Sequence, residues 1–386
     1  MKKIAVFTGT RAEYGLLYWI LKGLRDGDNV DLQLLVGGSH LSHEFGHTID
    51  NIEKDGFLVT ERLDFLLSSD SSLAISKSLA LAVIAGADCM ERLQPDLLVL
   101  LGDRYECLAL AQCAMLANIP IAHIHGGEKT EGAVDDVIRH AISKMSHLHF
   151  TATKTYQNRV IQLGEHPSRV FDYGAPGLDN IDKLPLLSKK QLADVIEFPQ
   201  LEVYFLITYH PVTLSSNEAK LALDNLLTVL AEYPNYQVLI TFPNADTHGR
   251  QLIDALKTFV SKYAERAKLF ESMGQLNYLS AMKHASLVIG NSSSGIIEAP
   301  SFQVPTVNIG DRQKGRVCAD SVFHCGESVE SISKSIETAL QQEPVHVVNP
   351  YGKGGASERI VEKLMTVNID SLLQKSFYDI DINGND

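Results

Sequence analysis

Short apolar runs alternate with longer amphipathic segments along the whole chain. In the first half, runs with the length of β-strands lie at residues 4–8, 32–36, 97–101, 121–125, 148–151 and 170–173. The second half repeats the pattern at residues 204–208, 238–241, 287–290 and 306–309. Stretches with helical periodicity lie between them, such as 14–25, 72–93 and 106–117. Alternating strands and helices are typical of βαβ units around a parallel sheet.

Several of the predicted strands contain only large aliphatic residues, without alternation of polar and apolar positions. The run at 97–101, for example, reads Leu-Leu-Val-Leu-Leu. A strand that helices cover on both faces has this composition. We therefore predict an α/β fold with doubly wound sheets.

The length of the chain predicts two domains. It has 386 residues, whereas a single hydrophobic core stops growing at roughly 250–300 residues. Residues 174–200 contain two early glycines and several prolines, so we place the junction there. We predict an N-terminal Rossmann-like domain at 1–178, a C-terminal one at 179–365 and a tail at 366–386 whose last ten residues are frayed. Two such domains facing each other would form a central ligand cleft at the carboxyl ends of both sheets.

The charge of the chain limits its partners. With 34 basic and 47 acidic residues, the formal net charge is −13, which argues against general binding to nucleic acid or to an anionic membrane. We expect no stretch long enough to span a bilayer and no signal peptide, because Arg11 and Glu13 interrupt the apolar N-terminal run. The five cysteines form no C-x-x-C pair, as is usual for reduced thiols. We therefore expect a cytoplasmic protein.

The first candidate for binding chemistry is the segment Thr8-Gly9-Thr10-Arg11-Ala12-Glu13-Tyr14, which follows the first predicted strand and begins a helix. A turn at Gly9 and a helix start would offer free N–H groups to an anion, and Arg11 would add a positive charge. The alternative is an ordinary strand–helix turn with a solvent-exposed arginine. The segment is not a G-x-G-x-x-G motif, so nothing supports a dinucleotide cofactor.

Two further candidates follow buried strands of the first half. Asp103 and Arg104 follow the strand at 97–101, where doubly wound folds bind ligands; the alternative is an aspartate that caps the next helix. The densest segment reads His123-Ile-His125-Gly-Gly-Glu128, then Glu131, Asp135-Asp136 and Arg139-His140. Crowded carboxylates and imidazoles suit proton transfer next to a sugar C–O bond. Metal binding through His-x-His and helix capping by Asp135 and Asp136 are the alternatives.

The second half contains a candidate anion site. His210 lies in Thr208-Tyr209-His210-Pro211, directly after a predicted strand. The segment Gly290-Asn291-Ser292-Ser293-Ser294-Gly295 leads into a helix that carries Glu298, and Asp311-Arg312 follows the next strand. Small residues at a helix start can hold a phosphate, and Glu298 could accept both ribose hydroxyls. A serine-rich turn without function is the alternative.

Together, the segments TGTRAEYG, LGDR, HIHGGE with the DD and RHA groups that follow it, TYHP and GNSSSGIIE resemble the UDP-N-acetylglucosamine 2-epimerase family, in its hydrolysing branch. The resemblance extends in the same order from the N-terminus to about residue 360. It implies two Rossmann-like domains of the glycosyltransferase-B type, no cofactor and no metal. It also implies a homodimer or homotetramer.

The resemblance also implies roles for single residues. Those implied to bind the UDP-sugar are Arg11, Ala12, Arg104, His210, Ser292, Ser293, Glu298 and Arg312. Those implied to be catalytic are Asp103, Asp135, Asp136 and His210, which assists the departure of UDP. Where other branches have a catalytic glutamate, this chain has His125, so either His125 or Glu128 is the candidate base.

The implied reaction converts UDP-N-acetylglucosamine to N-acetylmannosamine and UDP through a glycal-like intermediate, for the synthesis of sialic-type sugars. Two alternatives stay open: the same reaction on UDP-2,4-diacetamido-2,4,6-trideoxyglucose, or a non-hydrolysing 2-epimerase. A glycosyltransferase with the same architecture and a nucleotide-sugar-binding regulator are more distant alternatives.

Overall fold

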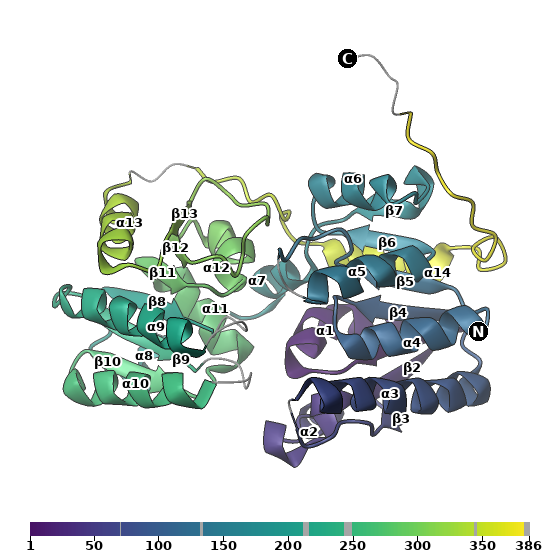
Figure 1. The fold of residues 1–386 in the computed structure, drawn as a ribbon, viewed down its shortest axis with the longest axis horizontal. Helices are drawn as coiled ribbons and strands as arrows, with labels where there is room; N and C mark the ends of the chain where they lie inside the picture. Colours follow the sequence, from purple (N-terminus) through teal and green to yellow (C-terminus); the bar gives the residue numbers. More distant parts are fainter. Residues whose placement is uncertain (70, 132–133, 211–215, 243–248, 343–345, 382–386) are drawn as a thin grey trace. The chain divides into compact units, whose positions relative to one another are not determined.

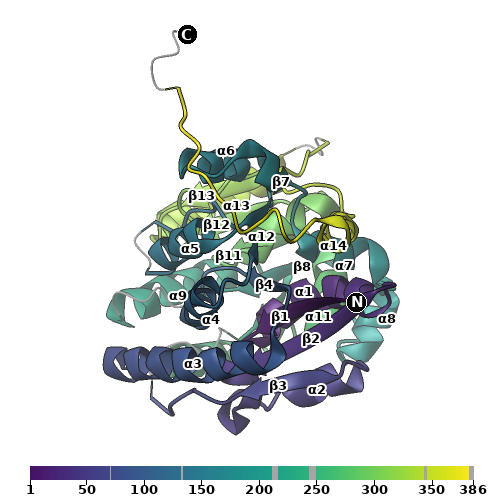
Figure 2. The same ribbon diagram turned by 90° about the vertical axis from the view of Figure 1, so that its right-hand side faces the viewer.

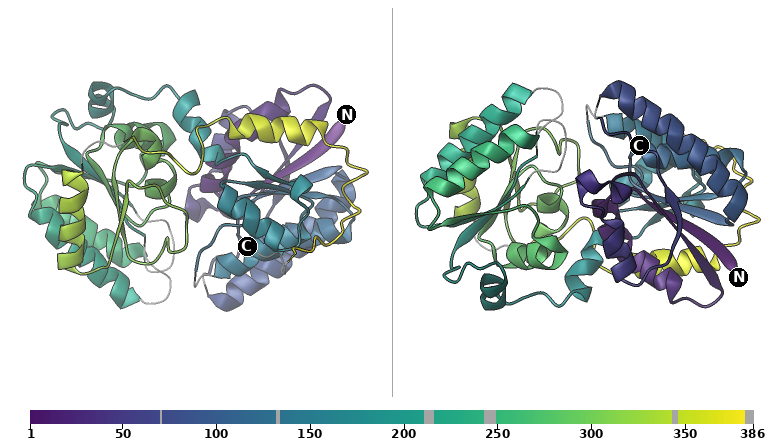
Figure 3. Two further views of the ribbon diagram at one scale, coloured as in Figure 1. Left: turned by 90° about the horizontal axis from the view of Figure 1, so that it is seen from above. Right: turned by 90° about the horizontal axis from the view of Figure 1, so that it is seen from below.

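A computed structural model describes residues 1–69, 71–131, 134–210, 216–242, 249–342 and 346–381. It divides into two compact units, one formed by Met1–Asp179 together with the chain from Gly354 onward, and the other by Asn180–Lys353. Each unit contains one parallel sheet between two layers of helices, as the views in Figure 3 show. The predicted α/β class with two Rossmann-like units is confirmed.

The first unit contains a seven-stranded sheet in the order β3-β2-β1-β4-β5-β6-β7 (Figure 1). Its strands are β1 (Lys2–Thr8), β2 (Val30–Gly37), β3 (Val59–Leu63), β4 (Leu97–Leu101), β5 (Ile121–Ile124), β6 (Leu148–Thr151) and β7 (Val170–Asp172). Its helices are α1 (Arg11–Arg25), α2 (Ile49–Lys54), α3 (Ser72–Leu93), α4 (Tyr105–Leu116), α5 (Val134–Met145), α6 (Lys154–Gln162) and α14 (Ala356–Thr366). The strand order reverses between β1 and β4, which is where doubly wound folds bind ligands.

The second unit repeats this arrangement with six strands in the order β10-β9-β8-β11-β12-β13. The strands are β8 (Tyr204–Thr208), β9 (Gln237–Thr241), β10 (Ala267–Phe270), β11 (Leu287–Gly290), β12 (Thr306–Ile309) and β13 (Val322–Cys325). The helices are α7 (Asp179–Lys183), which begins at the boundary, α8 (Lys189–Val195), α9 (Ser216–Ala231), α10 (Gly249–Lys262), α11 (Gly274–His284), α12 (Ser294–Ile297) and α13 (Val329–Gln341). Here the order reverses between β8 and β11.

Gly290 lets the two central strands of the second unit approach each other. Its φ is +141°, and a Cβ atom at this position would clash with the Thr208 carbonyl oxygen. Because only glycine fits here, the loops that follow β8 and β11 begin side by side. Those loops carry His210 and the serine-rich segment.

The assignment of residues 179–365 to the second domain is wrong at its carboxyl end. Helix α14 packs in the first unit, where Ile360 and Leu364 join the core that contains α1. Gly23 of α1 permits this close approach, since a Cβ atom there would lie 2.9 Å from Val361 Cγ2. The Lys2 ammonium also donates to the Met365 carbonyl oxygen at 2.8 Å. The chain therefore returns to the first unit after leaving the second.

The C-terminal segment is attached to the first unit rather than frayed up to residue 381. Figure 2 shows it passing β7 and α6. The Tyr378 N–H donates to the Gly164 carbonyl oxygen at 2.9 Å, and Leu372 is buried. Residues 382–386, which the prediction also called frayed, lie outside the described residues.

The expectation that no stretch is long enough to span a bilayer is wrong for α3. Within the described residues, this helix alone is long enough and apolar enough to cross a membrane, judged by its length and composition only. It packs against α4, and a Cβ atom on Gly86 would lie 2.6 Å from Leu110 Cδ2. One face of α3 therefore lies in the core with Ala82, Cys89 and Met90.

Candidate functional site

The loop between β1 and α1 is held by Glu13. Thr10 is the N-cap of α1, and its Oγ1 accepts a hydrogen bond from the Glu13 N–H at 3.3 Å. The Glu13 carboxylate accepts in turn from the N–H groups of Gly9 at 2.7 Å and Thr10 at 3.1 Å. The prediction that this turn offers free N–H donors is therefore wrong for these two groups. Arg11 and Ala12 are exposed on the first turn of α1.

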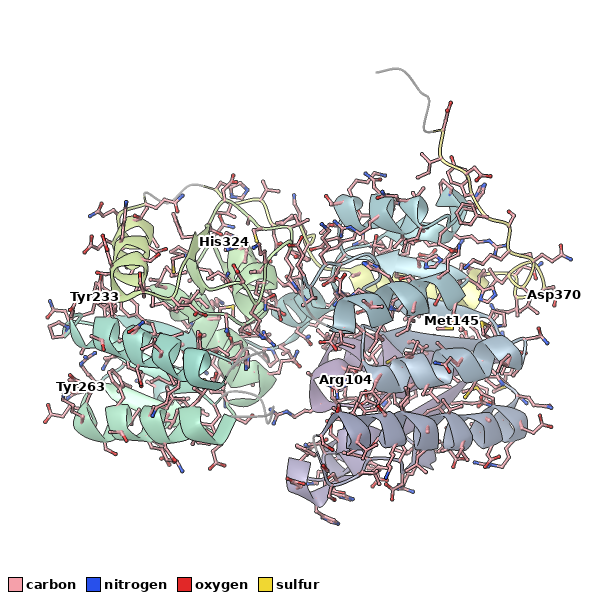
Figure 4. All side chains as sticks on the ribbon, in the orientation of Figure 1. Arg104, Met145, Tyr233, Tyr263, His324 and Asp370 are labelled. Carbon is pink, nitrogen blue, oxygen red and sulfur yellow. The ribbon has the colours of Figure 1, made fainter. Side chains whose placement is uncertain are left out.

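Glu13 also interacts with charged residues at the start of α4. Arg104, labelled in Figure 4, lies at the amino-terminal end of this helix, with its Nη2 3.0 Å from Glu106 Oε1. Burial raises the pKa of Glu13 to about 7; the positive charge of Arg104 opposes this rise and the negative charge of Glu106 adds to it. Burial therefore favours the protonated form of the carboxyl group that holds the first loop.

His123, in β5, and His125, just after it, are two residues apart but have different surroundings. The fully buried His123 places Nε2 2.7 Å from the Gly102 carbonyl oxygen and Nδ1 3.0 Å from Ser143 Oγ. Burial lowers its pKa to about 3, so it is neutral. His125 lies just beyond β5 rather than inside it, contrary to the predicted strand end. Its Nδ1 lies 2.5 Å from Glu128 Oε1.

Arg139 of α5 connects the acidic residues of the first unit. Its side chain is 2% exposed. Nη1 donates to the Glu128 carbonyl oxygen at 3.0 Å, and Nη2 donates to the Asp103 carboxylate and, at 3.2 Å, to Thr130 Oγ1. A buried guanidinium needs a compensating charge, which Asp103 supplies. Asp103 therefore binds Arg139, and the N-cap of α4 is Arg104.

The predicted acidic pair lies on the first turn of α5 with its two members in different surroundings. Asp136 Oδ1 accepts from the Thr130 N–H at 2.6 Å and lies 3.7 Å from Arg139 Nη1. Asp135 is exposed. We refer to Arg139, Asp103, Glu128, Thr130 and Asp136 as the Arg139 cluster. Among the described residues, no group of three or more His, Cys, Asp and Glu side chains is arranged to hold a metal ion.

In the second unit, Asn291 holds both His210 and Arg312. The His210 N–H donates to Asn291 Oδ1 at 2.7 Å, and Asn291 Nδ2 donates to the His210 carbonyl oxygen at 2.8 Å. Arg312 Nη1 and Gln313 Nε2 donate to the Asn291 carbonyl oxygen at 3.0 and 2.9 Å. Burial, and secondarily the charge of Arg312, lowers the pKa of His210 to about 3. The ring is therefore neutral, and Arg312 supplies the positive charge beside it.

Hydroxyl groups form a chain next to this pair. Ser294 Oγ lies 3.0 Å from Ser292 Oγ and 2.6 Å from Tyr278 Oη, which lies 3.2 Å from Thr208 Oγ1. Ser293 is the N-cap of α12. The chain joins the loop after β11 to the end of β8. Pro211 of the predicted motif lies outside the described residues.

Glu298 ends α12, which has only four residues, instead of lying on the first turns of a longer helix. Its Oε2 is buried and has no hydrogen-bond partner among the described residues. Burial raises the pKa of Glu298 to about 8, while the positive charge of Arg316 opposes the rise. A protonated carboxyl group can both donate and accept, so Glu298 is suited to a ligand with hydroxyl groups.

Many of the predicted site residues are connected by hydrogen bonds or ion pairs to one residue within their own unit. Asp103, Glu128 and Asp136 meet at Arg139, and His210 and Arg312 meet at Asn291. The sequence motifs contain both Arg139 and Asn291, but the motifs assigned them no role. Their function as connecting residues depends on hydrogen bonds between loops, which spacing along the chain does not reveal.

Two Rossmann-type sheets, each with polar residues after the carboxyl ends of its strands, define an α/β protein with the glycosyltransferase-B type of fold. The model of the family "UDP-N-acetylglucosamine 2-epimerase" matches residues 22–365. The chain belongs to this family.

Curated relatives place the chain in the hydrolysing branch. It is 40% identical to the GDP/UDP-N,N'-diacetylbacillosamine 2-epimerase (hydrolyzing) of Campylobacter jejuni, with 98% of this chain and 99% of that protein covered. It is 38% identical to the polysialic acid biosynthesis protein P7 of Escherichia coli, with 98% of each covered. It is 33% identical to the UDP-N,N'-diacetylbacillosamine 2-epimerase (hydrolyzing) of Legionella pneumophila, with 96% and 97% covered.

Solved structures show the same fold. The crystal structure of UDP-GlcNAc 2-epimerase from Neisseria meningitidis bound to UDP-GlcNAc matches with a TM-score of 0.80, covering 95% of this chain and 100% of that chain. The sequence identity in this match is 20%. The resemblance to the hydrolysing branch and the glycosyltransferase-B fold are therefore both confirmed.

Proposed function

We propose that this enzyme releases UDP from a UDP-linked 2-acetamido sugar, inverts C2 and liberates the free mannosamine-type sugar. The Arg139 cluster is the observation that supports this proposal best. It gathers two side-chain carboxylates and the loop that carries Glu128 and His125 at the ends of β4 and β5. Proton removal and return at one carbon atom require at least two such groups.

The chemistry divides into elimination and hydration. In the first step, a base takes the proton from C2, the C–H electrons form a C1–C2 double bond, and the C1–O bond breaks so that UDP leaves. In the second step, water adds its hydroxyl to C1 while an acid delivers a proton to C2 on the opposite face. Because the C2 proton is weakly acidic, expulsion of the diphosphate must drive the first step.

We assign the diphosphate and the ribose to residues of the second unit. His210, Ser292, Ser293 and Arg312 would supply hydrogen-bond donors after the carboxyl ends of β8, β11 and β12. Glu298 would accept the ribose hydroxyls through its buried Oε2, which lacks a partner among the described residues. In the first unit, Arg11 and Arg104 are the exposed cations assigned to the substrate, and Asp103, Asp135 and Asp136 are the acidic residues assigned to proton transfer.

For the sugar itself, we propose UDP-N-acetylglucosamine, the substrate that the sequence resemblance implies. A second candidate is UDP-N,N'-diacetylbacillosamine, a 2,4-diacetamido-2,4,6-trideoxy sugar, because two relatives are named for it. The two sugars differ at C4 and C6, away from the C2 atom on which the chemistry takes place. The same catalytic groups therefore serve either substrate.

Incubation of the enzyme with each UDP-sugar in deuterated water tests the proposal. We expect UDP release from one sugar together with a single deuterium at C2 of the free product, detected by NMR. A UDP-linked product would instead indicate a non-hydrolysing epimerase. UDP release that depends on an added acceptor would indicate a glycosyltransferase, and either result would overturn the proposal.

A further inference from the structure

The backbone after β5 fixes the position of His125. This residue has a φ of +64°, in the left-handed region, and its N–H donates to the Phe150 carbonyl oxygen at 3.0 Å. Two glycines follow it. A Cβ atom on Gly126 would lie 2.9 Å from Ser143 Oγ, and one on Gly127 would clash with the Tyr156 carbonyl oxygen. A left-handed conformation is unfavourable for a residue with a Cβ atom, so the surrounding structure holds His125 in this orientation.

The ring of His125 has one partnered and one unpartnered nitrogen. Nδ1 lies 2.5 Å from Glu128 Oε1, and the two residues are 8% and 3% exposed. Because a carboxylate only accepts hydrogen bonds, Nδ1 carries the hydrogen. In the neutral ring, Nε2 then holds a lone pair. This atom is buried and has no hydrogen-bond partner among the described residues.

A buried nitrogen without a hydrogen-bond partner is unfavourable, so native structures rarely keep one without a reason. His123 provides the contrast, because both of its ring nitrogens have partners and it lies two residues earlier on β5. Of these two histidines, only His125 has a lone pair that a substrate could meet. His125 is connected to Asp103 through its partner Glu128 and through Arg139, which donates both to the Glu128 carbonyl oxygen and to the Asp103 carboxylate.

We propose that His125 Nε2 is the base that removes the C2 proton, and that Glu128 is the positioning residue that fixes the Nδ1–H form of the ring. This inference rests on the proposed function and names the base for that reaction. The C2–H electrons form the C1–C2 double bond, and the C1–O electron pair leaves on the diphosphate. The proton remains on Nε2, where the Glu128 carboxylate compensates the charge of the imidazolium until the proton passes to solvent.

The geometry favours His125 over direct attack by Glu128. One oxygen of the Glu128 carboxylate already accepts the short hydrogen bond from Nδ1, and its backbone carbonyl is bound to Arg139. A pair in which a carboxylate orients a histidine recurs in enzymes that use imidazole as a base.

Variants at His125 test the proposal. Asparagine tolerates the left-handed backbone of this residue, so we expect His125→Asn to fold and to lose kcat by a factor of about 10²–10⁴, the usual contribution of a general base, with little change in KM. His125→Gly leaves a cavity in which added imidazole should restore part of the activity. Retention of more than a fifth of wild-type kcat by His125→Asn would overturn the assignment, and so would a His125→Gly variant that imidazole does not activate.

Glu128→Gln separates positioning from direct catalysis. Without the carboxylate, the imidazolium is less stable, so the acid limb of the kcat/KM profile should move to lower pH while measurable turnover remains. An unshifted acid limb would show that Glu128 does not stabilise the protonated base, and a loss of kcat as large as that of His125→Asn would show that Glu128 does more than position the ring; either result would overturn its assignment as a positioning residue. The control His123→Gln alters a buried histidine outside the proposed machinery and should lower the melting temperature without moving the profile. If wild-type enzyme releases UDP and incorporates deuterium while His125→Asn does so equally well, the assignment of the base fails and the proposed function stands.

Discussion

Asn291 and His210 are joined by two reciprocal hydrogen bonds, from the His210 N–H to Asn291 Oδ1 at 2.7 Å and from Asn291 Nδ2 to the His210 carbonyl oxygen at 2.8 Å. The Asn291 side chain thus satisfies the backbone that follows β8, while the Asn291 backbone carbonyl oxygen accepts from Arg312 Nη1 at 3.0 Å. A shift of Asn291 would displace a neutral imidazole and a cation together. The sharpest test of the second unit as a diphosphate site is therefore at Asn291.

Asn291→Ala should weaken UDP binding by about tenfold or more. It removes two buried hydrogen bonds, each with a net contribution of about 1 kcal/mol, and releases the loop that carries His210. Asn349→Ala is a matched control, because the Asn349 side chain also makes hydrogen bonds, donating to Ile297 O at 2.8 Å and Ser301 Oγ at 2.7 Å. Calorimetric titration with UDP should show a loss of affinity for Asn291→Ala alone. Equal losses would mean that general stability, and not the His210 loop, controls binding.

Asp103→Asn should reduce turnover at least 100-fold and leave UDP affinity nearly unchanged. Asparagine has almost the same shape but cannot take up a proton, and it removes the charge that compensates the buried Arg139 guanidinium. The measurements are initial rates of UDP release and UDP titration of the same preparations. Asp88→Asn, on an exposed position of α3, should behave as wild type. A parallel loss of affinity and rate in Asp103→Asn would contradict a role in proton transfer.

Glu298→Gln should change how stability depends on pH. The folded-state pKa of Glu298 is raised to about 8 from an ordinary value of 4.5. Between these two values the folded state binds a proton that the unfolded state has lost, so the contribution of Glu298 to stability falls as pH rises from about 4.5 to about 8. Glutamine has no proton to lose, so wild type and variant should match near pH 4.5 and the variant should be more stable at pH 8.

Thermal unfolding monitored across this pH range provides the measurement for Glu298. Glu337→Gln, on an exposed position of α13, is the control and should follow the wild-type curve. Wild-type and Glu298→Gln curves that stay parallel from pH 4.5 to pH 8 would show that Glu298 is already ionised in the folded protein.

The apolar pattern of the sequence predicted the central strands but not all the edges of the sheets. The strands β3, β10 and β13 each lie at an edge, and each is only partly buried. β3, for example, reads Val-Thr-Glu-Arg-Leu. An edge strand lacks a second neighbour and keeps polar side chains, so it does not produce the continuous aliphatic run that identifies a central strand.

The sequence pattern also could not predict that α14 belongs to the first unit. Its sequence has helical periodicity, but periodicity gives no partner for the apolar face. That partner is α1, where Gly23 has no side chain and leaves room for Val361. Whether two helices far apart in the sequence pack together depends on the shapes of both surfaces. Periodicity shows only that each helix has an apolar face.

The motifs predicted at which strand ends the candidate residues lie, but not which hydrogen bonds they make. Parallel strands end at the same edge of a sheet, so Asp103 and His125 could be expected there from their positions alone. Their hydrogen-bond partners could not. The Glu13 carboxylate accepts from the N–H groups of Gly9 and Thr10 in the predicted anion-binding turn, and Arg139 binds residues from three segments.

The C-terminal segment gives a further prediction, at Lys375. Its ammonium lies 2.8 Å from the buried Glu165 carboxylate and donates to the carbonyl oxygens of Lys144 and Ser146 at 2.7 Å each. Burial alone would raise the pKa of Glu165, but the hydrogen bond from His149 and the two lysines outweigh it and lower the pKa to about 2. The stabilisation is therefore complete above about pH 4.5 and is lost as pH falls toward 2.

Lys375→Met should lower the stability of the first unit near pH 7, by about 2–4 kcal/mol, because it leaves a buried carboxylate and two carbonyl oxygens with fewer partners. The difference from wild type should narrow as pH falls from 4.5 toward 2, since protonation of Glu165 removes the charge that Lys375 pairs with. Urea unfolding at several pH values measures both effects. Lys77→Met, at an exposed position on α3, controls for the lost charge. A Lys375→Met variant as stable as Lys77→Met at pH 7 would show that the C-terminal segment does not stabilise the first unit through this ion pair.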